Sequence, residues 1–335
     1  MNWNSGYTSR YFGMIVDPIS WADTEQFTIA GGSIKRASTG LRESVSLDGV
    51  DIDLNSEKWV RIYLDARQGR QSTVIPLFTG IATSPDYTYD GLLKTTPIEC
   101  YSVLKASNDV YLERGWYAPS GGDGAGLAKT LLERSTPAPV VVDGGESRRL
   151  SSHIIAENNE TCLTMADKIL AAINWRIRIQ GDGTIRICPQ ATAPSAFYDS
   201  IENDAIEPQL TLKKDWYVCP NVFRATSGNS YAIAKDESID SPLSIKNRGR
   251  EVWAEETDLN VTESLISYAK RRLKQLQSYA FQIKYTRRYN PNVLVTDFVN
   301  LNYPAQGLYG NYKVTGQSIT LGYACSTSED VEMTI

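Results

Sequence analysis

The most restrictive feature of this sequence is that turn-forming residues interrupt its apolar segments at short intervals. Residues 59–64 form the clearest strand-like segment, and residues 50–54 place Val50, Ile52 and Leu54 on one face and two aspartates on the other. Side chains that alternate in this way point to opposite faces of a strand. A chain made of many short strands between turns is expected to form a β-sandwich or a small barrel.

Both ends of the chain carry this pattern. In the first hundred residues the predicted strands are 26–30, 33–38, 44–47, 50–54, 59–64, 74–85 and 95–101. In the last third they are 210–216, 221–226, 231–234, 281–285, 298–301, 312–316 and 318–321. The dipeptides Asp48-Gly49 and Asp90-Gly91 are typical of tight turns between such strands. Both ends are therefore expected to be β-rich.

Helical periodicity appears between these regions and again near the end. The predicted helices span 102–109, 126–134, 160–175 and 262–279. The last of them has an apolar stripe made of Leu265, Ala269, Leu273 and Leu276. Asn159 or Thr161 is expected to cap the third helix, and Asn260 with Glu263 fits a capping box at the fourth.

A hairpin is predicted directly after the third helix. Apolar residues alternate with arginines over 175–179, Gly181-Asp182-Gly183 turns the chain, and alternation resumes over 185–187. The glycine-rich segment 119–126 is expected to be a flexible loop. No Gly-Lys-Ser/Thr follows it, so it lacks the pattern of a phosphate-binding loop.

The expected fold class is α+β and mainly β, with two small β-barrel domains and an intervening, packed α/β part. Residues 1–100 are expected to form the first barrel, residues 101–206 a helical and hairpin domain, and residues 207–335 a second barrel with a long helix. A length of 335 residues agrees with this division, because domains usually have roughly 100–200 residues.

Composition argues against several chemistries. His153 is the single histidine, so a His-rich zinc or iron site cannot form within one chain. A serine nucleophile with His153 as base lacks the Gly-x-Ser-x-Gly pattern, and a surface histidine is the preferred interpretation. The five cysteines have no C-x-x-C spacing and are expected to be reduced, buried thiols. No catalytic, cofactor-binding or metal-binding residue is therefore predicted.

Charge and hydropathy limit the partners. The net charge of −5 argues against a protein whose main work is gripping nucleic acid. The first residues lack the basic and apolar regions of a signal peptide, and no segment is apolar enough for a membrane helix. We therefore expect a protein made in the cytoplasm and not exported by a cleaved signal.

Two surface features have competing interpretations. The basic run 270–274 could contact phosphates, but its cations lie opposite the apolar stripe, so a solvated helix face is favoured. A set of aromatic residues could stack on sugar rings or anchor a subunit interface, and the interface is favoured. These aromatic residues are Tyr87, Tyr89, Trp116, Tyr117, Trp216 and Tyr217.

Three stretches, taken in order, resemble the baseplate hub (tail-tip) proteins of bacteriophages. The first, 34–54 continued by 59–63 and 76–81, is similar to the first barrel of a hub. The second is the helix ending at 173–175 and the hairpin that follows it. The third, 290–299 followed by 310–315, is similar to the closing stretch of a hub, with Thr296 in place of the usual glycine. The family includes the hub part of siphophage tail-associated lysins and the central hub of contractile tails.

The resemblance implies a structural virion protein of the tail, assembled in the host cytoplasm, and not an enzyme. A homotrimer with two barrels per chain would close the tail tube, adapt its six-fold symmetry to a three-fold tip and let DNA pass on ejection. Implied partners are a distal tail or tail tube protein, the tape measure protein, and a tail fibre or receptor-binding protein. Many relatives continue into a lysin, whereas this sequence ends at Ile335, so cell-wall digestion is not expected. The alternatives are a glycan-binding or cell-wall-degrading tail enzyme, and the hub of a tail-like bacteriocin.

Overall fold

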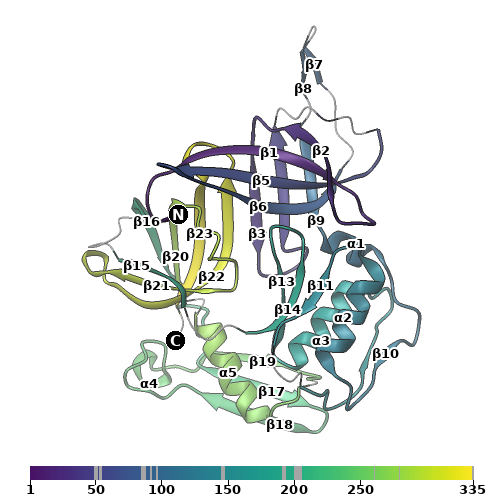
Figure 1. Ribbon diagram of the computed structural model, residues 1–335. Helices are drawn as coiled ribbons and strands as arrows, with labels where there is room; N and C mark the ends of the chain where they lie inside the picture. The colour runs from purple at the N-terminus through teal and green to yellow at the C-terminus, as the bar shows by residue number, and fades with distance from the viewer. Residues whose placement is uncertain are drawn as a thin grey trace.

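The computed structural model describes residues 1–48, 52, 55–83, 88–90, 93–95, 97–144, 148–190, 194–199, 206–259, 261–278 and 280–333. The protein is mainly β, as the sequence predicts. A large sheet occupies the upper part of the view in Figure 1, and the helices lie below it.

The large sheet has 13 strands drawn from both ends of the chain. The first region supplies β1 (Thr8–Val16), β2 (Asp23–Thr28), β3 (Gly31–Ala37), β4 (Glu43–Asp48), β5 (Lys58–Gln68), β6 (Gln71–Ala82) and β9 (Ile98–Ser102). The later strands are β15 (Pro194–Asp199), β16 (Ile206–Lys214), β20 (Phe281–Arg288), β21 (Phe298–Tyr303), β22 (Leu308–Thr320) and β23 (Ser326–Met333). The order is β16-β20-β23-β22-β3-β4-β9-β6-β5-β1-β2, and β21 and β15 extend the sheet beside β22.

Strand β22 joins the two ends of the chain. Its residues 308–313 pair with β21, and its residues 316–320 pair with β3 on the same edge. Strand β23 follows its other edge over residues 312–319, with a shift of register between Val314 and Gly316. The two strands predicted at 312–316 and 318–321 are therefore one continuous strand.

Each half of this sheet encloses its own apolar core. The core of the first half contains Ile34, Ile62 and Phe78, together with Ile319 and Cys325 from the end of the chain. The core of the second half contains Tyr198, Ile283, Tyr285, Val299 and Val331. Among the described residues no closed barrel is found, since the strand pairing runs from β16 to β2 without returning on itself, and the two expected barrels are instead two halves of one sheet joined by β3 and β22.

The middle part consists of three helices packed on a small sheet (Figure 1). Its elements are α1 (Leu104–Asp109), β10 (Tyr117–Ala118), α2 (Gly124–Ser135), β11 (Val140–Val142), β12 (Ile154–Ile155), α3 (Cys162–Ala172), β13 (Trp175–Ile179) and β14 (Ile185–Pro189). Strand β14 lies between β13 and β11, and β10 pairs with β12. Thr161 caps α3, since its hydroxyl accepts the amide of Thr164 and the two residues form a capping box.

A small unit lies at the bottom of Figure 1, below the later half of the large sheet. It consists of β17 (Val222–Ser227), β18 (Ser230–Lys235), α4 (Ile245–Arg248), β19 (Trp253–Glu256) and α5 (Leu265–Ser278). The sheet order is β18-β17-β19, and α5 packs on one face through Ala269 and Leu273. The predicted apolar stripe of this helix is confirmed. The remaining elements are β7 (Thr88–Asp90), β8 (Leu93–Thr95), η1 (Pro304–Gln306) and η2 (Tyr323–Cys325).

The four predicted helices are confirmed as α1, α2, α3 and α5. The expected loop 119–126 is wrong at its end, because α2 begins at Gly124. Several strands were not expected from the sequence, among them β1, β11, β15, β19 and β23. Of the predicted strand 50–54 only Ile52 is described, and Gly49, Tyr87, Gly91, Asn260 and Tyr279 lie outside the described residues.

Candidate assembly surfaces and the joints between the parts

The tip of the β13–β14 hairpin inserts against the first half of the large sheet. A Cβ atom on Gly181 would lie 1.9 Å from the carbonyl oxygen of Pro76. A Cβ atom on Gly183, whose φ is +83°, would lie 2.8 Å from Trp21. Only glycine therefore allows this approach, which explains the Gly-Asp-Gly sequence of the turn.

Arg61 of β5 holds the hairpin tip in place. Its guanidinium lies 2.6 Å from the Asp23 carboxylate and donates to the backbone carbonyl of Asp182 at 3.1 Å. The indole nitrogen of Trp21 donates to the same carbonyl at 3.1 Å, and the Thr79 hydroxyl donates to the carbonyl of Gly181 at 2.8 Å. The Arg61 side chain is 8% exposed, so this joint is an internal polar contact rather than a surface ion pair.

A second joint ties β13 to the segment before β21. Asp297 is buried, and its carboxylate lies 2.9 Å from the Arg178 guanidinium and 3.6 Å from that of Arg176. Arg176 also donates to the carbonyl of Thr296 at 2.6 Å. Thr296 has a φ of +76°, and its buried hydroxyl has no hydrogen-bond partner. A β-branched residue is strained at this positive φ, whereas glycine adopts it without strain. The conformation therefore fits the glycine that the hub pattern has at this position.

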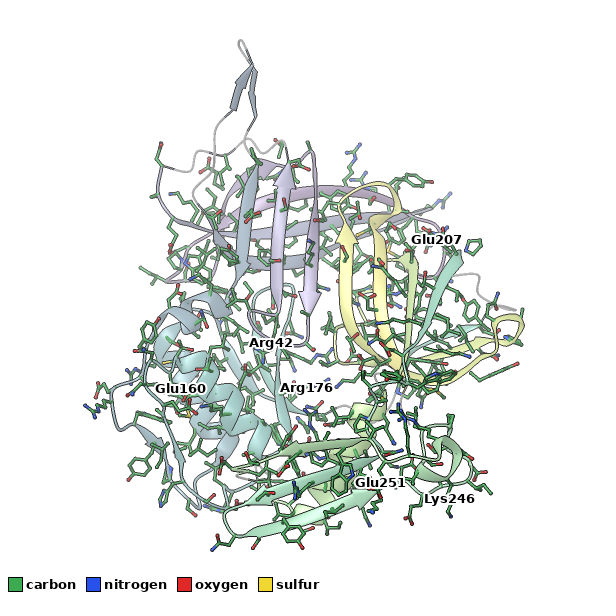
Figure 2. The ribbon with its side chains drawn as sticks, turned by 180° about the vertical axis from the view of Figure 1, so that it is seen from behind. Arg42, Glu160, Arg176, Glu207, Lys246 and Glu251 are labelled. Carbon is green, nitrogen blue, oxygen red and sulfur yellow. The ribbon has the colours of Figure 1, made fainter. Side chains whose placement is uncertain are left out.

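The two joints meet a third at the centre of the molecule, where Figure 2 labels Arg42 and Arg176. Arg42 in the β3–β4 turn lies 2.5 Å from Asp167 of α3. Next to it Arg36 and Glu43 form a buried ion pair at 2.8 Å. Burial raises the pKa of Glu43 to about 7, although Arg36 opposes the shift. A cavity of about 30 Å³ lies here, which is large enough for a water molecule.

The second half of the large sheet has a buried polar centre. Arg287 and Glu329 pair across β20 and β23 with side chains that are 1% and 0% exposed. The carboxylate also accepts hydrogen bonds from the Tyr285 hydroxyl at 2.7 Å and the Gln317 amide at 2.6 Å. Burial raises the pKa of Tyr285 well above its usual value. The pair is satisfied on several sides, as a buried ion pair must be.

The histidine considered as a catalytic base lies beside the β10–β12 ribbon. Its Nδ1 accepts the backbone amide of Ser120 at 3.2 Å, and its ring meets Tyr117 edge-on at 5.4 Å. The Ser151 hydroxyl donates to the carbonyl of Val261 at 2.8 Å.

In the part of the chain that the structure describes, no group of three His, Cys, Asp or Glu side chains could hold a metal ion. All five cysteines are buried and unpaired, which confirms their predicted burial.

The aromatic candidates belong to separate surfaces. Tyr117 is exposed on the middle part, where Trp116 packs partly buried against the core. Trp216 and Tyr217 are exposed after β16, in a loop that two arginines hold. Arg248 and Arg250 both donate to the carbonyl of Tyr217, at 3.0 and 2.8 Å, and Arg250 lies 4.9 Å from its ring. An exposed and well-fixed group of Trp, Tyr and Arg has the composition of an interface anchor.

The basic run on α5 contains two arginines that form ion pairs and two lysines that form none with the residues the structure describes. Arg271 lies 2.5 Å from Glu263, and Arg272 lies 2.7 Å from Glu256. Lys270 and Lys274 are exposed. Among the described helices none is long and apolar enough to cross a membrane.

Comparison with known proteins identifies the fold. No family model matches the sequence, and no curated protein matches it. Among solved structures, the tail protein from Neisseria meningitidis MC58 has a TM-score of 0.70 at 14% identity, covering 98% of this chain and 96% of that one. The 43 kDa tail protein of prophage MuSo2 from Shewanella oneidensis has a TM-score of 0.69 at 12% identity, covering 96% and 98%.

A third structure is the E. coli protein c3393, a type VI secretion component described as similar in structure to the T4 tail proteins gp27 and gp5. Its TM-score is 0.51 at 9% identity, and the match covers 92% of this chain and 76% of that one. The chain has the fold of a phage tail protein. Within that class, the resemblance to baseplate hub proteins is confirmed at the level of the fold.

Proposed function

We propose that this chain is a structural protein of a phage tail, the hub that closes the tail tube at its tip. The observation that carries the proposal is the fold, which the tail protein of Neisseria meningitidis shares over 98% of this chain and 96% of its own. Sequence resemblance to hub proteins points in the same direction. The site of action is then the virion tail, and the work is assembly rather than catalysis.

The two cores of the large sheet support a three-fold hub. Each half of the sheet encloses a separate core, as the two barrels of a hub chain would. Three chains then supply six similar units, which match a six-fold tube on one side and a three-fold tip on the other. A head-to-tail interface closes into such a ring when its rotation angle is right.

The buried joints supply the stiffness that an adaptor needs. Three joints connect the middle part to the two halves of the large sheet. They are the hairpin tip, the Asp297 cluster and the Arg42–Asp167 pair. Three chains at −5 each carry a net charge of −15, which disfavours tight binding of DNA phosphates to the hub while DNA passes. The partners are a tube or distal tail protein above and a fibre or receptor-binding protein below.

Imaging of assembled tails by cryo-electron microscopy tests this proposal. We expect three copies around the tail axis at the end of the tube. A copy number of six, or a position away from the axis, would contradict it. A phage-derived bacteriocin would show the same position in a particle without a head.

Incubation with purified peptidoglycan tests the structural role separately. We expect no release of soluble fragments. Release that disappears in His153→Ala, or in a variant of one carboxylate, would establish a tail enzyme instead.

A further inference from the structure

The small unit has an open strand edge. Strand β18 ends its sheet and pairs only with β17 in the described part of the chain. The amide of Asp236 donates to the carbonyl of Asn221 at 2.9 Å, so even-numbered residues here bond toward β17. By the alternation of an antiparallel pair, the backbone groups of Tyr231, Ile233 and Lys235 therefore point outward.

This edge lacks the protection that the large sheet has at its own edges. Edge strand β16 carries Pro208, Lys213 and Lys214, which discourage pairing with another strand. The middle of the β18 edge is Ile233 instead, next to the exposed ring of Tyr231. The one charge on this strand, Lys235, is paired with Glu251 at 2.8 Å, so the edge from Tyr231 to Ala234 is uncharged and is a template for a further strand.

Residues of β18 and α5 line a groove beside this edge; Figure 1 shows α5 lying over the sheet that β18 ends. Its volume is about 460 Å³, and Ala234 and Leu273 line its apolar floor. The groove is open because β18 turns small side chains toward the helix: Ala234 packs on α5 in the core of this unit. A cavity of this size accepts a large aliphatic side chain from a bound segment.

The charges around the groove favour an acidic segment. Lys270 and Lys274 line it from α5, are exposed, and make no ion pair in the described part of the chain. Lys235 is already bound to Glu251 at 2.8 Å. On the loop side Asp236 is occupied by hydrogen bonds from Ser241 at 2.6 Å and Gln277 at 3.0 Å, and Asp240 adds a negative charge at that end. The helix side is therefore the basic side.

We propose that β18 and α5 bind an extended, acidic segment of another polypeptide by strand addition. The segment pairs with the outward backbone groups of β18, places an aliphatic side chain over Ala234 and Leu273, and sets carboxylates beside Lys270 and Lys274. Main-chain hydrogen bonds supply affinity in such complexes, and alternate side chains supply specificity. The inference rests on this unit alone and is independent of the role in the tail.

Two fluorescein-labelled peptides test the proposal by fluorescence anisotropy with the full chain. The first is Glu-Thr-Leu-Thr-Glu, whose leucine and glutamates share one face of a strand, and the second replaces both glutamates by lysine. We expect saturable binding of the acidic peptide, weakened by salt, and no binding of the basic one. The double variant Lys270→Glu, Lys274→Glu should weaken binding about tenfold or more, since two ion pairs become repulsive.

Matched controls separate this surface from general charge effects. Lys246→Glu changes an exposed lysine on α4, labelled in Figure 2, and should leave binding unchanged. Ile233→Pro removes one outward amide and should abolish binding. If that variant does not fold, hydrogen exchange of the natural chain replaces it, and the amides of Tyr231, Ile233 and Lys235 should gain protection with the acidic peptide. No saturable binding, equal binding of both peptides, or unchanged exchange at these amides overturns the proposal.

Discussion

Replacing Thr296 by glycine should stabilise the protein. Thr296 holds a φ of +76°, and its side-chain oxygen is buried without a hydrogen-bond partner. Its backbone is fixed from both sides, because its amide donates to Val314 at 2.7 Å and its carbonyl accepts Arg176 at 2.6 Å. The chain therefore cannot relax out of this conformation, and the strain persists in the folded state.

The size of the effect follows from four contributions. Relief of the left-handed conformation is worth about 1–2 kcal/mol, and removal of a buried hydroxyl without a partner about 1 kcal/mol. Against this, glycine gains unfolded-state freedom worth about 0.5–1 kcal/mol, and loss of the buried methyl costs about 0.8 kcal/mol. The net expectation is a gain of about 1 kcal/mol in the free energy of unfolding.

Denaturant unfolding followed by tryptophan fluorescence measures this gain, with Thr296→Ala as the matched variant. Alanine also removes the hydroxyl but keeps the strained φ, so it should be about 1 kcal/mol less stable than glycine. Thr286→Gly, in the regular strand β20, should instead lower stability by about 1 kcal/mol. If Thr296→Gly is no more stable than Thr296→Ala, backbone strain at this joint is refuted.

Three further variants test the joints and the buried charges. Gly181→Ala places a methyl group 1.9 Å from the carbonyl oxygen of Pro76 and should lower the free energy of unfolding by about 2–3 kcal/mol. Gly144→Ala, where the added Cβ has no atom within 4 Å, should change it little. Equal effects of the two variants would contradict the tight joint. Glu329→Gln should cost about 3 kcal/mol by leaving Arg287 without a counter-charge. Glu329→Leu with Arg287→Met should cost less than Glu329→Leu alone, because both variants remove the acceptor of Tyr285 and Gln317 but only the single change leaves the Arg287 charge unpaired; a larger loss in the double variant would contradict the desolvation argument. Burial raises the pKa of Glu332 to about 6, so the folded state binds its proton more tightly and stability falls as pH rises from about 4.5 to 6, by up to about 2 kcal/mol. Glu332→Gln should remove this part of the pH dependence, and an unchanged slope in calorimetry would contradict it.

Periodicity was sufficient to predict α1, α2, α3 and α5 and many of the strands, because these elements are amphipathic, but it missed strands such as β1, β15 and β23. The stripe Leu265, Ala269, Leu273 and Leu276 predicted α5, and the Gly-Asp-Gly turn predicted the β13–β14 hairpin. The order of three weak motifs was enough to indicate the fold. Thr296 marks a case where a departure from the family pattern coincides with a strained backbone.

The joints could not be predicted in the same way. Arg61, Arg176 and Arg178 stand in alternating strands, where period two alone does not say which face is buried against another part of the chain. An arginine among apolar strand residues does indicate a buried polar contact. The sequence does not show the partner, however, because Asp23 and Asp297 are distant in sequence from these arginines. For the same reason the sequence did not predict that both ends of the chain join one sheet. The pairing of β3 with β22 is a long-range contact that no local sequence pattern indicates.

The pairing of β3 with β22 also sets the order in which the chain can fold during synthesis. The core that surrounds Ile34 includes Ile319, Leu321 and Cys325, which leave the ribosome long after Ile34. Until residues 316–325 have been synthesised, β3 has a vacant edge and this core stays incomplete, so the first half of the large sheet cannot finish folding. Contacts of such sequence separation slow folding and prolong the exposure of apolar strands. A nascent chain stalled before residue 316 should therefore depend on chaperones, whereas the middle part, whose core is built mostly from residues 103–187, can already be folded at that stage.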